Sequence, residues 1–120
     1  MQSLLLATDL SAAAEPALRR AADLAQRYDC PWFILHVVDG ERDRAKPAEW
    51  LERRVEQLAE SSGRAPEIWV EHGDVARQIV ACARWAEVDL VVLGAGTVCA
   101  RLYDLPCDLL IVPPARQEAA

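Results

Sequence analysis

Positive charge is scarce in this sequence. Its 120 residues include 13 lysines and arginines against 19 aspartates and glutamates, a net charge of −6 at pH 7, and Lys46 is the only lysine. Binding to nucleic-acid phosphates and to anionic lipid surfaces depends on clustered basic side chains. The charge balance therefore predicts that neither a nucleic acid nor a membrane surface is a partner.

Targeting signals and paired cysteines are also missing. Residues 1–9 lack the basic segment and long apolar run of a signal peptide, and no apolar run approaches the length of a membrane span. We therefore expect a cytoplasmic protein. The cysteines form no C-x-x-C pair and are expected to be thiols that act as small apolar groups. They are Cys30, Cys82, Cys99 and Cys107.

Motifs of the common catalytic and cofactor sites are absent as well. The chain has no phosphate-binding G-x-x-x-x-G-K-[ST] loop, no G-x-S-x-G elbow, and no cluster of cysteine, histidine and aspartate at metal-ligand spacing. Residues 94–99 (GAGTVC) match the dinucleotide pattern G-x-G-x-x-G at two glycines only. We therefore expect no enzymatic activity, no metal site and no bound cofactor.

What the sequence does contain is an alternation of short apolar runs with amphipathic stretches, which is typical of β-α-β units around a parallel sheet. We expect an α/β fold with a single doubly wound domain over residues 1–114 and a flexible tail over 115–120. The expected strands are residues 4–8, 31–38, 67–72, 89–93 and 107–112, and the expected helices end near residues 28, 62 and 87. The alternating pattern of 67–72 favours a sheet edge.

Several single residues carry expectations of their own. The first helix begins either with Ser11 as its N-cap or closer to Pro16, and Asp74 is the expected N-cap of the third helix. His36 lies within an apolar strand, which favours a hydrogen-bonded structural histidine over a ligand or a base. Trp85 lies opposite Ile79 on the third helix, so it either covers a neighbouring loop or contacts a partner chain.

Ligands of open parallel sheets bind outside the carboxyl ends of the strands, where the strand order reverses. The residues expected there include a histidine, three acids and the first two glycines of the loop after the fourth strand. They are Asp9, Val38, Asp39, His72, Gly73, Asp74, Gly94, Ala95, Gly96 and Thr97.

Five segments in order resemble motifs of the universal stress protein family: residues 4–11 (LLLATDLS), 35–39 (LHVVD), 73–76 (GDVA), 89–94 (DLVVLG) and 106–112 (PCDLLIV). The resemblance implies a five-stranded parallel sheet in the order 3-2-1-4-5 with helices on both faces. Many members of that family bind ATP or another adenine nucleotide, and many dimerise through the last strand.

The resemblance implies a remnant adenosine site made of Asp9, Val38 and Gly94. In the family, phosphates are bound by a G-x2-G-x9-G-[ST] loop that begins at the position of Gly94. Counted from there, the second glycine falls on Thr97 and the final pair on Cys107 and Asp108.

If Gly96 is taken as the second glycine, the final pair falls on Pro106 and Cys107, which also fails. Residues 94–106 form a crossover close to the minimum length, with room for at most a two-turn helix, so we expect the last helix to be short or missing. The chain is thus similar to a shortened family member that lacks most of the glycine loop, and triphosphate binding should be weak or absent.

These observations together predict a non-enzymatic stress-response module that acts through dimerisation or protein partners and has a degenerate nucleotide site. The homodimer contact is expected on the last strand, at Leu109 and Ile111 or at Leu110 and Val112. One alternative is a regulator that binds AMP or ATP at Asp9, Val38 and Gly94. Another is a thiol-based redox sensor that uses Cys99 or Cys107.

Overall fold

The computed structural model describes residues 1–38, 53–57, 64–94 and 102–114. Its sheet has five parallel strands in the order β3-β2-β1-β4-β5. The strands are β1 (Leu4–Thr8), β2 (Trp32–Val38), β3 (Glu67–His72), β4 (Leu90–Gly94) and β5 (Asp108–Val112). The expected fold class and strand order are confirmed.

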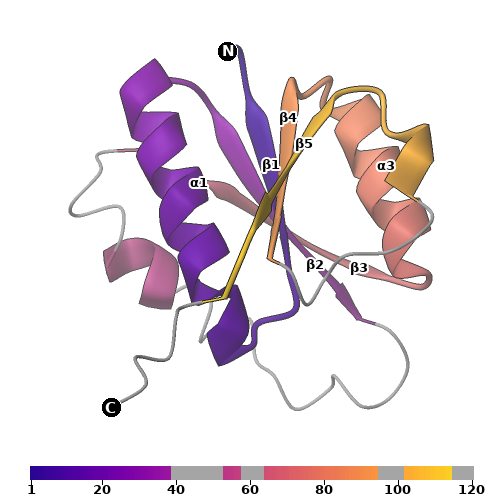
Figure 1. Cartoon of the computed structure of the whole chain (residues 1–120), viewed down its shortest axis with the longest axis horizontal. Coiled ribbons are helices and arrows are strands. Elements are labelled where there is room, and N and C mark those ends of the chain that lie inside the picture. Colours follow the sequence, from indigo (N-terminus) through magenta and orange to yellow (C-terminus); the bar gives the residue numbers. More distant parts are fainter. Residues whose placement is uncertain (39–52, 58–63, 95–101, 115–120) are drawn as a thin grey trace.

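Helices cover both faces of this sheet (Figure 1). On one face lie α1 (Glu15–Tyr28), the preceding 3-10 turn η1 (Ala12–Ala14) and the helical residues 53–57. On the other face lie α3 (Val75–Trp85) and the 3-10 turn η4 (Leu102–Asp104). No helix in the described part of the chain is long and apolar enough to span a membrane.

The core consists of two apolar clusters separated by the sheet. Every residue of β1 is buried, because β1 pairs with β2 and β4 and is covered by helices on both sides. Leu4 and Leu6 belong to the cluster under α1, whereas Leu5 and Ala7 belong to the cluster under α3. Side chains of a strand alternate between faces, so a continuous apolar run is what a central strand requires.

Helix α1 begins at Glu15 with Pro16 in its first turn, so the interpretation of Ser11 as its N-cap is wrong. The residue at the cap position is Ala14, which makes no side-chain capping bond. Ser11 is engaged elsewhere, because its hydroxyl donates a 2.6 Å hydrogen bond to the Asp9 carboxylate. A 3-10 turn therefore separates the end of β1 from the regular helix.

Helix α3 begins as expected, since the Asp74 carboxylate accepts a 3.0 Å hydrogen bond from the backbone N–H of Arg77. The helix ends at Trp85, two residues earlier than expected, and Glu87 adopts a left-handed conformation with φ 53°. Of the expected second helix, residues 53–57 are described, and Val55 is buried in the core.

The connection between β4 and β5 is short. Within residues 102–107 the connection contains the three-residue turn η4, and the expectation that the last crossover helix is short or missing stays a prediction for residues 95–101. Strand β5 begins at Asp108, one residue later than expected. Residues 95–101, with Gly96, Thr97 and Cys99, and the expected tail 115–120 lie outside the described residues.

The packing of α3 generates a stability prediction. Ile79 is fully buried between α3 and the sheet, so Ile79→Ala should leave a cavity and lower the free energy of unfolding by about 2–5 kcal/mol. Val70→Ala, at a β3 side chain that is 42% exposed, should change it by less than about 1 kcal/mol. Urea unfolding curves measure both values, and equal losses would contradict this packing.

Candidate functional site

The predicted adenosine-site residues lie at the carboxyl ends of the central strands of the sheet. Thr8 pairs with His36 on β2, and Ala7 pairs with Leu93 on β4, so the carboxyl ends of β1, β2 and β4 lie side by side. Asp9 follows β1, while Val38 and Gly94 are the last residues of β2 and β4. This is the position at which the strand order reverses on either side of β1.

The Asp9 carboxylate is held within the turn that leaves β1. Its Oδ1 accepts hydrogen bonds from the backbone N–H of Ser11 at 2.9 Å and from the Ser11 hydroxyl at 2.6 Å. Leu10 between them has φ 62°, and its N–H donates to the hydroxyl of Thr8 at 3.1 Å. The acid therefore shapes the local backbone at the end of β1.

Val38 and Gly94 are both packed by the surrounding chain. The Val38 carbonyl accepts a 3.1 Å hydrogen bond from the N–H of Gly73, which joins the end of β2 to the turn after β3. Gly94 faces the start of α1, where an added Cβ would lie 3.6 Å from the Cα of Ala14 and 3.8 Å from the Cβ of Ala17. These are ordinary contact distances, so packing alone does not require glycine at this position.

His36 lies beside this edge and is only 4% exposed. Its Nδ1 is 3.0 Å from the carbonyl oxygen of Thr8, a contact in which the ring nitrogen donates. The expectation of a hydrogen-bonded structural histidine is confirmed at this nitrogen. Nε2 is buried and has no hydrogen-bond partner among the residues that the structure describes, which the sequence did not indicate.

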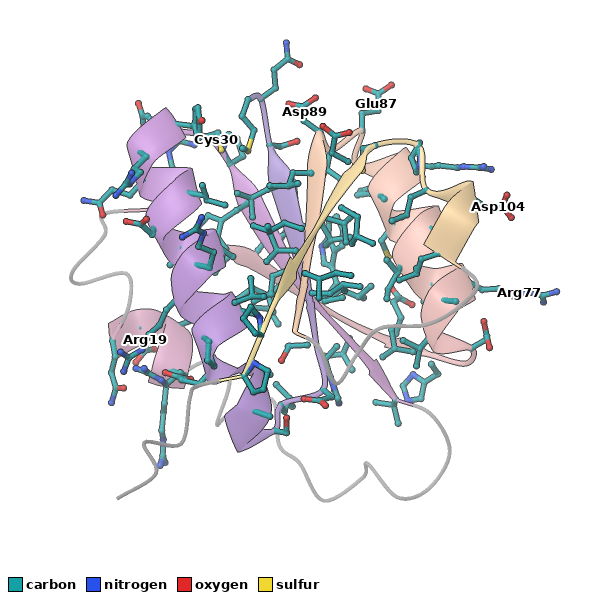
Figure 2. All side chains as sticks on the ribbon, in the orientation of Figure 1. Arg19, Cys30, Arg77, Glu87, Asp89 and Asp104 are labelled. Carbon is teal, nitrogen blue, oxygen red and sulfur yellow. The ribbon has the colours of Figure 1, made fainter. Side chains whose placement is uncertain are left out.

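The described part of the last connection lies beside α3. Leu102 is buried in the apolar cluster under α3, with Leu105 packed against that cluster. The Arg84 guanidinium donates a 3.3 Å hydrogen bond to the carbonyl of Asp104, which Figure 2 shows on the outer side of α3. Residues 102–107 thus run along the α3 face of the sheet, and only residues 95–101 connect them to Gly94.

Comparisons with known proteins agree with this arrangement. The model of the family described as "Universal stress protein family" matches residues 1–97. The chain belongs to the universal stress protein family. No curated sequence matches it significantly.

Solved universal stress proteins share the fold of this chain. Protein UspA from Lactobacillus plantarum is 23% identical with a TM-score of 0.77, over 92% of this chain and 97% of that one. A universal stress protein in complex with cAMP is 20% identical with a TM-score of 0.72, over 95% and 98%. One from Archaeoglobus fulgidus in complex with dAMP is 19% identical with a TM-score of 0.69, over 92% and 97%.

Three cysteines of this universal stress protein are described, and all are free thiols. Burial raises the pKa of Cys30, Cys82 and Cys107 above the ordinary value of 9.0. The negative charges of Asp108 and Asp89 raise the pKa of Cys107 further. These thiols are therefore protonated at neutral pH, as expected of cysteines that act as small apolar groups.

No metal centre is found among residues 1–38, 53–57, 64–94 and 102–114, where no three histidine, cysteine or acidic side chains gather closely enough to hold an ion. His72 is exposed at the end of β3.

The sequence did not reveal a second feature on the α3 face, where Trp69 and Trp85 line one pocket. The Trp85 ring packs edge-on against Trp69 of β3, a contact that neither alternative named. The alternative that Trp85 contacts a partner chain stays a prediction.

The raised thiol pKa values predict how stability depends on pH. In the unfolded chain the thiols ionise near pH 9, whereas in the folded chain they retain their protons to higher pH, so stability should fall as pH rises above about 9. The loss per thiol is at most about 1.4 kcal/mol per pH unit. Replacing the buried Cys30 by alanine should make this decline shallower.

Urea unfolding at a series of pH values from about 7 to 10.5 measures the slope for both proteins. The comparison uses the slope, because Cys30→Ala also changes packing and shifts the whole curve. Equal alkaline slopes for the two proteins would contradict the conclusion that burial raises the pKa of Cys30.

Proposed function

We propose that this universal stress protein domain is a non-enzymatic regulatory module that acts in the cytoplasm through association with itself or with a protein partner. In this proposal it is a shortened family member whose nucleotide site is reduced to a remnant. The observation that carries the proposal is the short connection between Gly94 and β5, most of whose described part lies against α3.

A polyphosphate needs backbone N–H donors from a glycine-rich loop, or a helix N-terminus, directed at its oxygens. Residues 95–101 contain one glycine, Gly96, and one basic residue, Arg101. The described remainder of the connection contributes a single 3-10 turn and the negative charge of Asp104, with Asp108 following at the start of β5. Donors for a triphosphate are therefore few and the local charge opposes it.

The extent of the family match supports the same proposal. The matched residues 1–97 include β1 to β4 and end inside the last connection. The matched part carries Asp9, Val38 and Gly94, and the unmatched part carries the positions at which the final glycine pair of the family loop would fall. The chain thus departs from the family where the phosphate-binding segment is expected.

The polar groups described at the carboxyl ends of the strands make hydrogen bonds within the domain, which supports a non-enzymatic role. Ser11 donates to Asp9, the Val38 carbonyl accepts from Gly73, and His36 bonds to the carbonyl of Thr8 through Nδ1. A hydroxyl nucleophile needs a base beside it. The Ser11 hydroxyl does lie against the Asp9 carboxylate, but the same oxygen also accepts from the Ser11 backbone N–H, so we assign this contact to the turn after β1.

An adenine-nucleotide regulator is the second candidate function. Asp9, Val38 and Gly94 lie at one edge, and two structurally similar universal stress proteins are described as complexes with cAMP and dAMP. A nucleoside monophosphate needs fewer donors than a triphosphate, so this candidate predicts binding of AMP in preference to ATP.

The redox-sensor alternative receives no support from the described thiols. A reactive cysteine has a lowered pKa, because the thiolate is the nucleophile. The pKa of Cys107 is raised by burial and by two neighbouring acids. Cys99 lies outside the described residues.

Calorimetric titration tests the reduced nucleotide site. We expect no micromolar binding of ATP with magnesium, because the glycine pattern that binds the phosphates in the family is largely lost from this sequence and the nearby Asp104 and Asp108 are negative. Titration of AMP under the same conditions separates the two candidates: AMP binding that is at least about tenfold tighter than ATP binding would favour the nucleotide regulator. A micromolar dissociation constant for ATP would contradict the proposal.

The β5 edge is the surface proposed for the homodimer. Leu109 and Ile111 are 37% and 45% exposed, while Leu110 and Val112 pack against the cluster under α1. Of the two expected contact pairs, Leu109 and Ile111 therefore carry the accessible apolar surface. An edge strand with exposed apolar side chains and one charge, Asp108, is suited to pairing with another chain.

Light scattering after size-exclusion chromatography tests this surface. The wild-type protein should have twice the chain mass of 13.3 kDa, about 26.6 kDa, and Ile111→Lys should shift it toward 13.3 kDa by burying an unpaired charge at the contact. Val70→Lys, at an equally exposed side chain on the opposite edge strand, should leave the dimer intact. A wild-type monomer at high concentration would contradict the proposed dimer.

A further inference from the structure

Three aromatic rings form a row on the α3 side of the sheet. The Phe33 ring on β2 stacks on Trp69 of β3, with centroids 4.7 Å apart and planes inclined by 24°. The Trp85 ring at the end of α3 meets Trp69 edge-on, with centroids 5.4 Å apart and planes inclined by 75°. The row runs from the sheet interior to the surface.

A pocket of about 420 Å³ opens between the edge strand β3 and the helix α3. Strand β3 contributes Trp69 and Glu71. Helix α3 contributes four residues at helical spacing, which are Gln78, Ala81, Cys82 and Trp85. The Gln78 side chain is anchored, because it donates a 3.2 Å hydrogen bond to the carbonyl of His72.

Trp85 presents a large apolar surface to solvent, since its side chain is 78% exposed, and its ring contacts Trp69 edge-on. A tryptophan offers a wide, rigid contact surface at low conformational-entropy cost, because its side chain has only two rotatable torsions. The exposed indole is therefore suited to binding.

The pocket carries negative charge without a compensating cation. Glu71 makes no ion pair with any side chain in the described part of the chain, and no lysine, arginine or histidine lines the pocket. Glu71 lies close enough to Cys82, which also lines the pocket, for its negative charge to add to the effect of burial in raising the pKa of that thiol. Glu67, two positions before Trp69, is exposed on the same face of β3.

We propose that this pocket binds an arginine side chain carried by an extended segment of a protein partner, which pairs with the outer edge of β3. A guanidinium packs favourably on the face of a tryptophan and forms charge-assisted hydrogen bonds with a carboxylate. Trp85 and Glu71 supply these two groups at one pocket. The complementarity of charge identifies the ligand as basic.

The position of β3 identifies the ligand as an extended segment. Among the described strands β3 pairs with β2 alone, so no described strand occupies its other side, where an extended segment can add. Side chains of an added strand alternate between faces, and every second one would lie opposite the row Glu67, Trp69 and Glu71. Arginine at alternate positions with small apolar residues between them fits this row.

The test uses the full chain and a capped pentapeptide with arginine at its second and fourth positions and valine or threonine elsewhere. Calorimetry should show saturable binding that weakens as salt is raised from about 0.05 to 0.5 M, because part of the attraction is between exposed charges. A peptide with glutamate in place of both arginines should not bind.

Variants locate the binding to the pocket. Trp85→Ala should weaken peptide binding about tenfold, and Glu71→Gln about three- to tenfold. Tyr28→Ala and Glu56→Gln are matched controls, since they remove an exposed ring and one exposed carboxylate from the other face of the molecule, and both should leave affinity unchanged. Trp85→Phe keeps an aromatic face and should retain more binding than Trp85→Ala.

Three results would overturn the proposal. Equal binding of the arginine and glutamate peptides would exclude recognition of the cation. Unchanged affinity in both Trp85→Ala and Glu71→Gln would place binding elsewhere. A change of oligomeric state caused by Trp85→Ala would show that a second copy of the chain covers this pocket. The first two results leave the proposed nucleotide remnant and the β5 contact untouched, because neither involves the β3 edge. The third would also count against β5 as the dimer contact, and Ile111→Lys distinguishes the two surfaces.

Discussion

The burial of β1 between β2 and β4 is the constraint on which the rest of the structure depends. Because β1 is paired on both sides and covered on both faces, all five of its residues are apolar or internally satisfied. Its position makes the sheet order reverse at its carboxyl end, where Asp9 lies between the ends of β2 and β4. The candidate site therefore exists because of where the central strand is placed, independently of what binds there.

The sequence predicted the elements whose cause is local or periodic. The alternating residues 67–72 form an edge strand, and Asp74 caps α3. Of the two starts expected for the first helix, the one closer to Pro16 is right, because residues 12–14 form a 3-10 turn in which the Ala14 N–H donates to the Ser11 carbonyl. The contact of Trp85 with Trp69 joins residues from a helix and a strand, and residue spacing along the helix carries no information about that distance.

The two edges of the sheet differ in chemistry. The β5 edge exposes Leu109 and Ile111 and suits an apolar contact with an identical strand, whereas the β3 edge combines Glu71 with exposed tryptophan and suits a basic segment. The described residues 102–107 of the last connection lie against α3, and Leu109 and Ile111 of β5 stay exposed. The proposed reduction of the nucleotide site and the proposed role in association are thus compatible in one fold.

Native mass spectrometry of freshly purified protein tests the central claim most directly, because one spectrum reports both subunit number and any retained small molecule. The account predicts a dimer of about 26.6 kDa, twice 13.3 kDa, with no added mass. A species that carries the additional mass of ATP on each chain would contradict it, since a nucleotide retained through purification requires a phosphate site that the short connection does not provide.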